Sequence, residues 1–349
     1  MSGRAAAAPS LVAFPGPVLV MGAGSVGCYL GGRLLAAGAG VVFVGRPRVL
    51  EALATHGLTV TDLDGVRHPL PPSALALSTT VPAGSAPALV LLCVKSGATA
   101  EAAAELGRVL PAGTLVLSMQ NGVSNATVAA EAAPALRVLP GMVPYNIAEL
   151  GLGRFHRGTA GELAAEDDPS LRPWVAPMRA AGLPLVLHAD LRPVQWGKLL
   201  LNLNNPVNAL SGLPLRAELL DGGYRRCFAA LIDEALQVLA AAGIVPAQVT
   251  ALPPRWLPAV LRLPTPVFRR LAARMLRIDA QARSSMADDL AQGRRTEIDA
   301  LCGEVVRLAA QCGARAPMCS LLCEMLGEPS TLALPMPAAR LWSALAAAR

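Results

Sequence analysis

Residues 17–46, PVLVMGAGSVGCYLGGRLLAAGAGVVFVGR, have the order of a β-strand, a glycine-rich turn, a helix and a second β-strand. The apolar runs at the two ends are strand-like, and the small or apolar residues between them recur at helical spacing. Between the first strand and the helix, Gly22-x-Gly24-x-x-Gly27 has the spacing of a dinucleotide-binding turn. The stretch therefore predicts an α/β fold that begins with a Rossmann-type dinucleotide-binding domain.

Each glycine of this turn has its own role. Gly22 permits the tight turn, Gly24 lets a pyrophosphate approach the backbone, and Gly27 lets the helix pack close to the strand. The phosphates then bind the free N–H groups at the start of the helix. We expect the cofactor to contact the whole run: Gly22, Ala23, Gly24, Ser25, Val26 and Gly27.

The end of the second strand indicates which dinucleotide binds. Enzymes that use NAD usually place an acidic residue there, about 20 residues further on, to bind the ribose 2′-hydroxyl. This strand ends in VGRPR, with Arg46 and Arg48 and no acid. A guanidinium group can bind the 2′-phosphate of NADP, which a carboxylate would repel. Unless both arginines are ordinary surface charges, the strand end favours NADP.

Two further predicted strands also end in polar residues. APALVLLCVK, residues 86–95, ends at Lys95, and GTLVLSMQNG, residues 113–122, ends around Asn121. Ligands of open parallel sheets bind at the carboxyl ends of the strands. Either residue alone could be a plain transition from strand to loop. Together they predict that Lys95 contacts cofactor phosphates or substrate, and that Asn121 lies near the nicotinamide.

The second half of the chain reads as helices. CFAALIDEALQVLAAAG, residues 227–243, has apolar residues at helical spacing and ends in glycine. We therefore predict a loose N-terminal tail at residues 1–15 and an NADP-binding Rossmann-type domain at 16–188. An all-helical domain for substrate binding and catalysis is predicted at 189–349.

The segment WGKLLLNLNNPVNALSG, residues 196–212, places amides in a strongly apolar helix. At about 100° per residue, Lys198, Asn202 and Asn205 share an arc about 60° wide, separate from the apolar face made by Leu199, Leu200, Leu203, Val207 and Leu210. We call these three residues the polar stripe. The other two asparagines, Asn204 and Asn208, fall outside it. Amides with one ammonium suit a small polar ligand better than a solvated face would, and Pro206 is expected to bend or end the helix.

Lysine is scarce enough to need explanation. Of 30 basic residues, only Lys95 and Lys198 are lysine, and the rest are arginine. An ammonium group is a compact charge that can give up its proton, whereas arginine stays protonated at neutral pH. Two lysines in an arginine-rich chain could be chance, but both fall at predicted site positions.

Composition argues against several functions. Hydrophobic residues make up 53% of the chain and charged residues 15%, which indicates a well-filled core. With no basic run and few aromatic residues, nucleic-acid binding is not expected. Seven cysteines without a CxxC pair and four isolated histidines predict reduced thiols and no metal site. No apolar run reaches ~18 residues, and Pro9, Pro15 and Pro17 interrupt the N-terminal run, so we expect a cytoplasmic protein without a membrane segment.

Taken together, the motifs resemble the ketopantoate reductase (2-dehydropantoate 2-reductase) family. They are GAGSVG, VK at Lys95, QNG at Asn121, WGKLLLN around Lys198, and SSM…RRTEID from Ser284 to Asp299. They span residues 18–305, and their combination is specific although each motif alone is not. The resemblance implies NADPH-dependent reduction of ketopantoate to pantoate, in pantothenate and coenzyme A biosynthesis.

The resemblance also implies roles for individual residues. Lys198 matches the catalytic general acid, and Glu297 matches the glutamate that helps to set up that lysine and the substrate. The expected substrate-binding residues are Asn121, Asn202, Asn205 and Ser285, the last binding the substrate carboxylate. Arg46 is expected at the 2′-phosphate and Lys95 near the cofactor.

One departure from the family pattern concerns the substrate. The pattern places a second asparagine, followed by proline, four residues after the first, whereas Asn202 to Asn205 is three. Either the helix is locally tighter, or Asn205 and Asn208 share the role differently. The alternatives are a related NADPH-dependent reductase of another branched 2-oxoacid, or a non-catalytic NADP-binding regulatory protein. The sequence leaves open whether the chain forms a homodimer.

Overall fold

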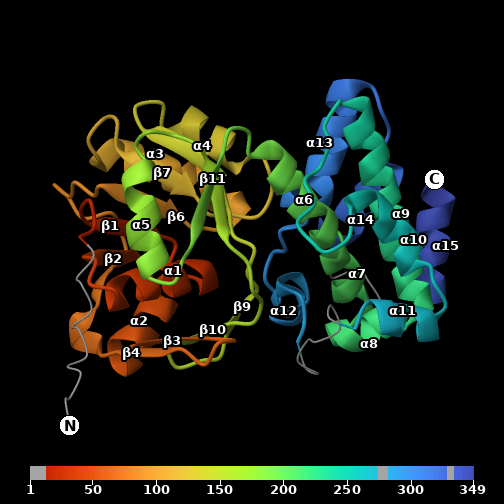
Figure 1. Ribbon diagram of the computed structural model, residues 1–349, viewed down its shortest axis with the longest axis horizontal. Coiled ribbons are helices and arrows are strands. Elements are labelled where there is room, and N and C mark those ends of the chain that lie inside the picture. Colours follow the sequence, from red (N-terminus) through yellow and green to blue (C-terminus); the bar gives the residue numbers. More distant parts are fainter. Residues whose placement is uncertain (1–12, 274–281, 328–333) are drawn as a thin grey trace, which may run out of the picture. The chain divides into compact units, whose positions relative to one another are not determined.

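The computed structural model describes residues 13–273, 282–327 and 334–349. The chain divides into two compact units, drawn in Figure 1. The first runs to Leu191, apart from the loop Asn121–Ser124, which belongs to the second unit together with Arg192–Arg349. Most of the predicted N-terminal tail lies outside the described residues. An α/β unit followed by a helical unit confirms the predicted fold class.

The first unit is built on a large sheet of eight strands. The strand order is β12-β11-β8-β7-β6-β1-β2-β5, and the six strands from β8 to β5 run parallel. Only β11 pairs antiparallel to β8, with β12 parallel to β11. The bounds are β1 Val18–Met21, β2 Val41–Val44, β5 Ala76–Ser78, β6 Leu89–Leu92, β7 Leu115–Ser118, β8 Arg137–Met142, β11 Leu163–Glu166 and β12 Leu185–His188.

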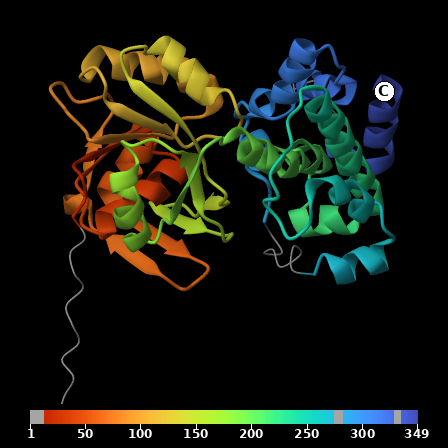
Figure 2. The same cartoon turned by 45° about the horizontal axis from the view of Figure 1, so that its top comes forward.

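Helices cover both faces of this sheet. On β1, alternate residues enter different cores, with Val18 and Val20 on one face and Leu19 and Met21 on the other. The helices α3 (Thr99–Val109) and α4 (Asn125–Ala132) cover the second face, as Figures 1 and 2 show. Burial on both sides explains why these strands are apolar throughout rather than alternating. The unit also contains α1 (Ser25–Ala36), α2 (Pro47–His56) and α5 (Arg172–Ala180).

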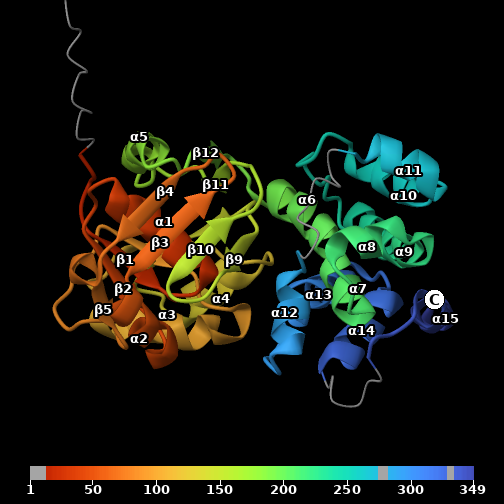
Figure 3. The same cartoon turned by 90° about the horizontal axis from the view of Figure 1, so that it is seen from below.

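Helix α1 also packs against a second, smaller sheet, visible beside it in Figure 3. That sheet has the order β4-β3-β10-β9, with bounds β4 Arg67–Leu70, β3 Leu58–Asp62, β10 Arg154–Arg157 and β9 Ile147–Glu149. A Cβ at Gly31 would lie 2.5 Å from the Phe43 ring, and one at Gly32 would lie 2.8 Å from a Val60 methyl group. Glycine is unfavourable inside helices, but here only glycine lets both sheets approach α1.

A buried ionic cluster ties α1 to the small sheet. Arg33 Nη1 donates to Asp62 Oδ2 at 2.7 Å, and Arg33 Nε donates to the carbonyl of Ala181 at 3.0 Å. Arg157 Nη2 lies 3.5 Å from the same Asp62 oxygen. Burial alone would raise the pKa of Asp62, but hydrogen bonds from the Val66 N–H and Arg33 lower it below its usual value. The carboxylate therefore stays ionised between the two guanidinium groups.

The described part of the second unit consists of helices and connecting segments. Helix α9 is the longest and contacts α6, α7, α8, α10, α13, α14 and α15. Its apolar residues, such as Leu231 and Ala235, are fully buried in one core. The bounds are α6 Arg192–Asn202, α7 Asn204–Ser211, α8 Leu215–Leu220, α9 Gly222–Ala241, α10 Leu257–Leu261, α11 Thr265–Leu271, α12 Ser285–Ala291, α13 Cys302–Cys312, α14 Pro317–Gly327 and α15 Ala338–Ala348.

A polar pair lies inside this helical unit. Asn204 Nδ2 donates to Glu218 Oε2 at 2.9 Å, and the Glu218 side chain is fully buried. Burial raises the pKa of Glu218 to about 7, although its hydrogen bonds from Asn204 and Asn208 lower it. Among the described residues, Glu218 Oε1 and Asn204 Oδ1 are buried acceptor atoms without a hydrogen-bond partner. A protonated carboxyl, which could act as a donor, suits this site better than a carboxylate.

This pair makes stability depend on pH. Because the folded-state pKa of Glu218 lies above its ordinary value of 4.5, its stabilisation is complete below pH 4.5 and is lost as pH rises through about 7. The variant Glu218→Gln cannot ionise. We expect it to be more stable than wild type at pH 8, by up to about 3 kcal/mol, and similar at pH 5.

Thermal unfolding of both proteins at pH 5 and pH 8 would check this. The exposed Glu324→Gln is the matched control and should not alter the pH dependence. An equal effect of Glu218→Gln at both pH values would contradict the assignment.

Candidate active site

The glycine turn joins β1 to α1 and leaves room for a ligand. Gly22 has a φ of +109°, and a Cβ there would lie 2.6 Å from the Val94 nitrogen. A Cβ at Gly27 would lie 2.1 Å from the Gly22 carbonyl oxygen. Packing thus requires both glycines. By contrast, a Cβ at Gly24 would meet no atom within 4 Å, so the protein interior does not explain this glycine.

The start of α1 is open to an anion. Gly24 is its N-cap residue, and no side chain caps the helix there. The first N–H groups of a helix have no partners within the helix, and together with its dipole they attract phosphate. Ala23 directly precedes this N-cap residue, and Ser25 and Val26 are the first two residues of α1. The turn therefore has the geometry that a pyrophosphate requires.

The arginines at the end of β2 differ in their surroundings. Gly45 packs against Ala23 of the glycine turn, since a Cβ at Gly45 would lie 2.6 Å from the Ala23 Cβ. Arg46 follows directly, is exposed, and is the N-cap residue of α2. Arg48 is also exposed, but its guanidinium lies 3.7 Å from the Glu149 carboxylate. Of the two, Arg46 is closer in sequence to the turn.

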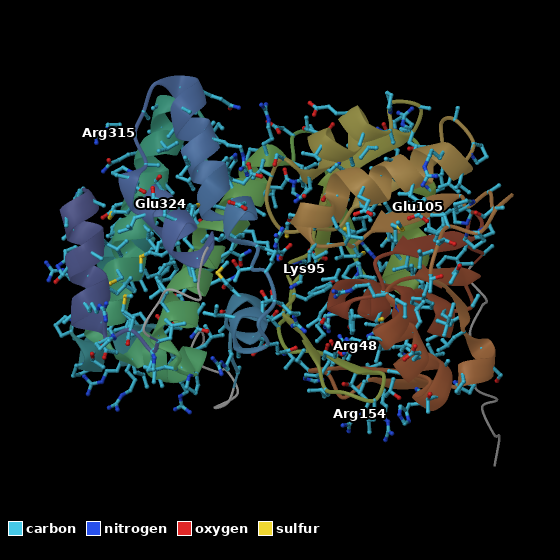
Figure 4. All side chains as sticks on the ribbon, turned by 180° about the vertical axis from the view of Figure 1, so that it is seen from behind. Arg48, Lys95, Glu105, Arg154, Arg315 and Glu324 are labelled. Atoms are coloured by element: carbon cyan, nitrogen blue, oxygen red, sulfur yellow. The ribbon has the colours of Figure 1, made fainter. Side chains whose placement is uncertain are left out.

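Lys95 follows the end of β6, beside the glycine turn. The preceding residues pack on that turn, with Cys93 N–H donating to Met21 at 2.8 Å. The Lys95 side chain is exposed at the surface of the first unit and is labelled in Figure 4. Gln120, at the end of the next strand, is instead buried and donates to the Val94 carbonyl and to Thr99 Oγ1. Its amide therefore links the segments that follow β6 and β7 by hydrogen bonds.

Lys198, Asn121 and Glu297 form one hydrogen-bonded network in the second unit. Lys198 Nζ donates to Asn121 Oδ1 at 3.0 Å, and Asn121 Nδ2 donates to Glu297 Oε2 at 3.2 Å. All three side chains are half-buried. The asparagine amide thus uses both ends, its oxygen accepting from the ammonium and its nitrogen donating to the carboxylate. The structure brings these three predicted residues together.

The surroundings of Lys198 adjust its acidity. Burial lowers the pKa of the ammonium to about 8, and the nearby Glu297 carboxylate raises it. At the preceding Gly197, a Cβ would lie 2.3 Å from the Ala247 carbonyl oxygen, so the chain around Ala247 packs closely against α6. A pKa near 8 keeps the group protonated at neutral pH and still able to release a proton.

The polar stripe does not lie on one continuous helix. Helix α6 ends at Asn202, Leu203 is a turn residue, and α7 begins at Asn204, ahead of Pro206. Asn202 lies one helical turn after Lys198, so these two share a face of α6. Asn205 lies beyond the break and is half-buried. The single helix assumed from the sequence therefore applies only as far as Asn202, because the helix is interrupted at Leu203.

The asparagines outside the stripe bind protein. Asn204 binds Glu218, as described above, and Asn208 is fully buried. Asn208 Nδ2 donates to the Leu213 carbonyl at 2.9 Å, and its Oδ1 accepts from the Ser284 N–H at 2.9 Å. Both the nitrogen and the oxygen of this amide therefore have partners within the protein. Of the two sequence-based explanations for the short spacing, the one in which Asn208 shares the substrate role is therefore disfavoured.

The two adjacent serines at the start of α12 have different environments. Ser284 is buried and caps the helix, since its Oγ accepts from the Ala287 N–H at 3.1 Å. Its Oγ also donates to the Asn205 carbonyl at 3.3 Å. Ser285, the predicted substrate-binding residue, is exposed. Ser284 thus fixes the segment, and the Ser285 side chain is accessible to a ligand.

A further contact was not predicted from the sequence. The loop Asn121–Ser124 belongs to the helical unit, whereas the sequence assigned it to the dinucleotide-binding domain. Glu304, in the first turn of α13, accepts hydrogen bonds from Val123 and Ser124 of this loop. An acidic residue in the first turn of a helix is common, so the sequence contains no signal that distinguishes Glu304.

Within residues 13–273, 282–327 and 334–349, no helix combines the length and apolarity that crossing a membrane requires. In the same described stretches, no group of three or more His, Cys, Asp or Glu side chains is placed to hold a metal ion.

Comparisons with known proteins agree along nearly the whole chain. The family model described as Ketopantoate reductase PanE/ApbA matches residues 18–168, and Ketopantoate reductase PanE/ApbA C terminal matches residues 190–329. A 2-dehydropantoate 2-reductase from Halobacterium salinarum is 31% identical over 316 residues, covering 88% of this chain and 97% of that protein. Another from Mesorhizobium japonicum is 29% identical, covering 83% and 90%.

Solved structures give the same result. A PanE/ApbA family ketopantoate reductase from Ralstonia eutropha JMP134 is similar with a TM-score of 0.75 at 30% sequence identity, covering 89% of this chain and 97% of that one. Both units of the chain are thus matched, each by the corresponding part of one family. The chain belongs to the ketopantoate reductase family.

Proposed function

We propose that this chain reduces 2-dehydropantoate (ketopantoate) to pantoate with NADPH. The observation that carries the proposal is the network of Lys198, Asn121 and Glu297, which positions an ammonium with a pKa of about 8. Family membership supports the substrate, since the Halobacterium and Mesorhizobium relatives are both 2-dehydropantoate 2-reductases. A non-catalytic NADP-binding protein would have no use for such a network.

The residues of the first unit suit the cofactor. The open space at Gly24 and the uncapped start of α1 fit a pyrophosphate, and exposed Arg46 fits a 2′-phosphate. Lys95 adds a positive charge beside the same turn. When bound, the reduced nicotinamide supplies the hydride that the C2 keto carbon of the substrate accepts.

Lys198 provides the proton for this reaction. As the keto carbon is reduced, negative charge develops on its oxygen, and an ammonium within hydrogen-bonding distance stabilises that charge. Nζ then donates a proton to the oxygen, which leaves a neutral amine and the 2-hydroxy acid. Asn121 Oδ1 holds Nζ in place, and Glu297 favours the protonated form. An arginine would hold its proton too tightly for this step.

The remaining predicted residues would bind the substrate. Asn202 lies on the same face of α6 as Lys198 and can donate to or accept from the hydroxyl group of the substrate. Asn205 and exposed Ser285 lie on segments joined through Ser284, and the Ser285 hydroxyl would bind the carboxylate. The break at Leu203 coincides with the unusual three-residue step, which favours a second candidate substrate, another branched 2-oxoacid.

A substrate panel tests the activity. Oxidation of NADPH by the purified protein is measured with ketopantoate and with other branched and aromatic 2-oxoacids at equal concentration. We expect ketopantoate to have the highest kcat/KM. A clearly higher value for another acid would establish the second candidate, and no turnover with any 2-oxoacid would refute the reductase assignment.

The proton donor has a distinct pH signature. Because the protonated form of Lys198 is the acid and its pKa is about 8, kcat is expected to be constant below pH 8 and to fall above it. Lys198→Ala should lower kcat by about a hundredfold or more and remove this dependence. Lys198→Arg keeps the charge and should also be slow. Near-normal turnover of either variant would show that another group donates the proton.

Cofactor choice tests Arg46. A charge-assisted bond to the 2′-phosphate contributes about 1.5–3 kcal/mol, so Arg46→Ala should raise KM for NADPH roughly tenfold to a hundredfold. KM for NADH should not change, because NADH lacks that phosphate. Arg48→Ala is the matched control, since Arg48 already lies near Glu149. The NADP preference would be wrong if wild type used NADH better than NADPH.

A further inference from the structure

Glu304 holds the loop that carries Asn121. Its Oε1 accepts hydrogen bonds from the Val123 N–H at 3.3 Å, from the Ser124 N–H at 3.0 Å, and from the Ser124 hydroxyl. The Glu304 side chain is 7% exposed, and the Val123 side chain packs against the core of the helical unit. One buried carboxylate therefore binds three donors of two consecutive loop residues.

The negative charge of the Glu304 carboxylate is stabilised by groups of α13 itself, independently of the loop. Glu304 lies in the first turn of α13, where the helix dipole stabilises a negative charge, and Arg307 Nη2 lies 3.3 Å from the same oxygen. Its charge is therefore balanced within α13. The three bonds to the loop are additional, and they fix a segment that has no regular structure of its own.

We propose that Glu304 is a positioning residue for the reductase reaction, which holds the loop so that Asn121 reaches Lys198 and Glu297. This inference rests on the proposed function. The Asn121 side chain meets Lys198 Nζ at 3.0 Å and Glu297 Oε2 at 3.2 Å, and both contacts depend on where the loop backbone lies. A small displacement of that backbone would break one or both, and misplacement by about 1 Å can cost a hundredfold in rate.

The position of Glu304 relative to the loop separates this role from a general contribution to stability. Glu304 touches Val123 and Ser124, not the three residues of the catalytic network. If Glu304 acts through the loop, its removal should lower kcat only while Asn121 is present. If it only stabilises α13, its removal should have the same effect with and without Asn121.

The decisive experiment is a double-mutant cycle measured on kcat. We expect Glu304→Ala to lower kcat about tenfold or more, with KM for NADPH changed less than twofold. In the Asn121→Ala background the same substitution should have little further effect, because the two residues act as one unit. Glu304→Gln retains an acceptor oxygen for the two N–H groups and should restore most of the activity.

Arg307→Ala is the matched control. It removes the ion-pair partner of Glu304 on the same helix, and its side chain is 48% exposed, but it leaves the bonds to the loop intact. We expect kcat of this variant to remain within twofold of wild type. Hydrogen exchange at the Val123 and Ser124 amides gives a readout independent of activity, and Glu304→Ala should lose protection there while Arg307→Ala does not.

Two results would overturn the inference. One is a Glu304→Ala enzyme with wild-type kcat, and the other is an equal loss of kcat with and without Asn121. Unchanged protection of the two amides in Glu304→Ala would exclude the loop contact itself. These outcomes differ from failure of the proposed function, in which wild type would reduce no 2-oxoacid although the exchange result could still hold.

Discussion

The site depends on keeping an ammonium group charged where water reaches it only in part. Lys198 loses hydration because it is half-buried, and this loss lowers its pKa. An oxygen of Asn121 and the negative charge of Glu297 compensate for part of the lost hydration. Without the Glu297 carboxylate, the pKa of Lys198 would be lower still, and a smaller fraction of this side chain would be charged at neutral pH. The three side chains come from different segments of the helical unit. Asn121 lies in the loop Asn121–Ser124, Glu297 directly precedes the short helix Ile298–Ala300, and Lys198 lies on α6.

Much of the fold could be predicted because its signals are local. The glycine turn, the apolar strands and the long helix α9 each follow from residues close together in the sequence. The small sheet could not be predicted in this way. Its central strands β3 and β10 pair Val60 with Phe155, almost a hundred residues apart, and β4 has no fully buried residue. Its one local trace on α1 is Gly32, which leaves room for Val60 and Leu58 of β3.

The site was only partly predictable for a related reason. Helical spacing separated Lys198 and Asn202 from Asn204 and Asn208, and the last two do bind protein. Periodicity could not locate the break at Leu203, although Pro206 indicated one nearby. Nor could it place Asn121 beside Lys198, because contacts across 77 positions leave no pattern in the sequence. The roles of Lys198 and Asn121 were inferred from the resemblance to the family. Neither helical periodicity nor that resemblance indicated Glu304.

Hydrogen bonds from two buried asparagines hold helix α7 in position. Asn204 is bound to Glu218, and Asn208 is bound to both Leu213 and the start of α12. These hydrogen bonds oppose rotation or sliding of α7 relative to α8 and α12. Inserting one residue to restore the longer spacing would therefore strain the single turn at Leu203 rather than shift α7. A change in chain length between Asn202 and Asn205 would thus fall on Leu203, whereas side-chain replacements on the half-buried face of α6 would leave the register of α7 as it is.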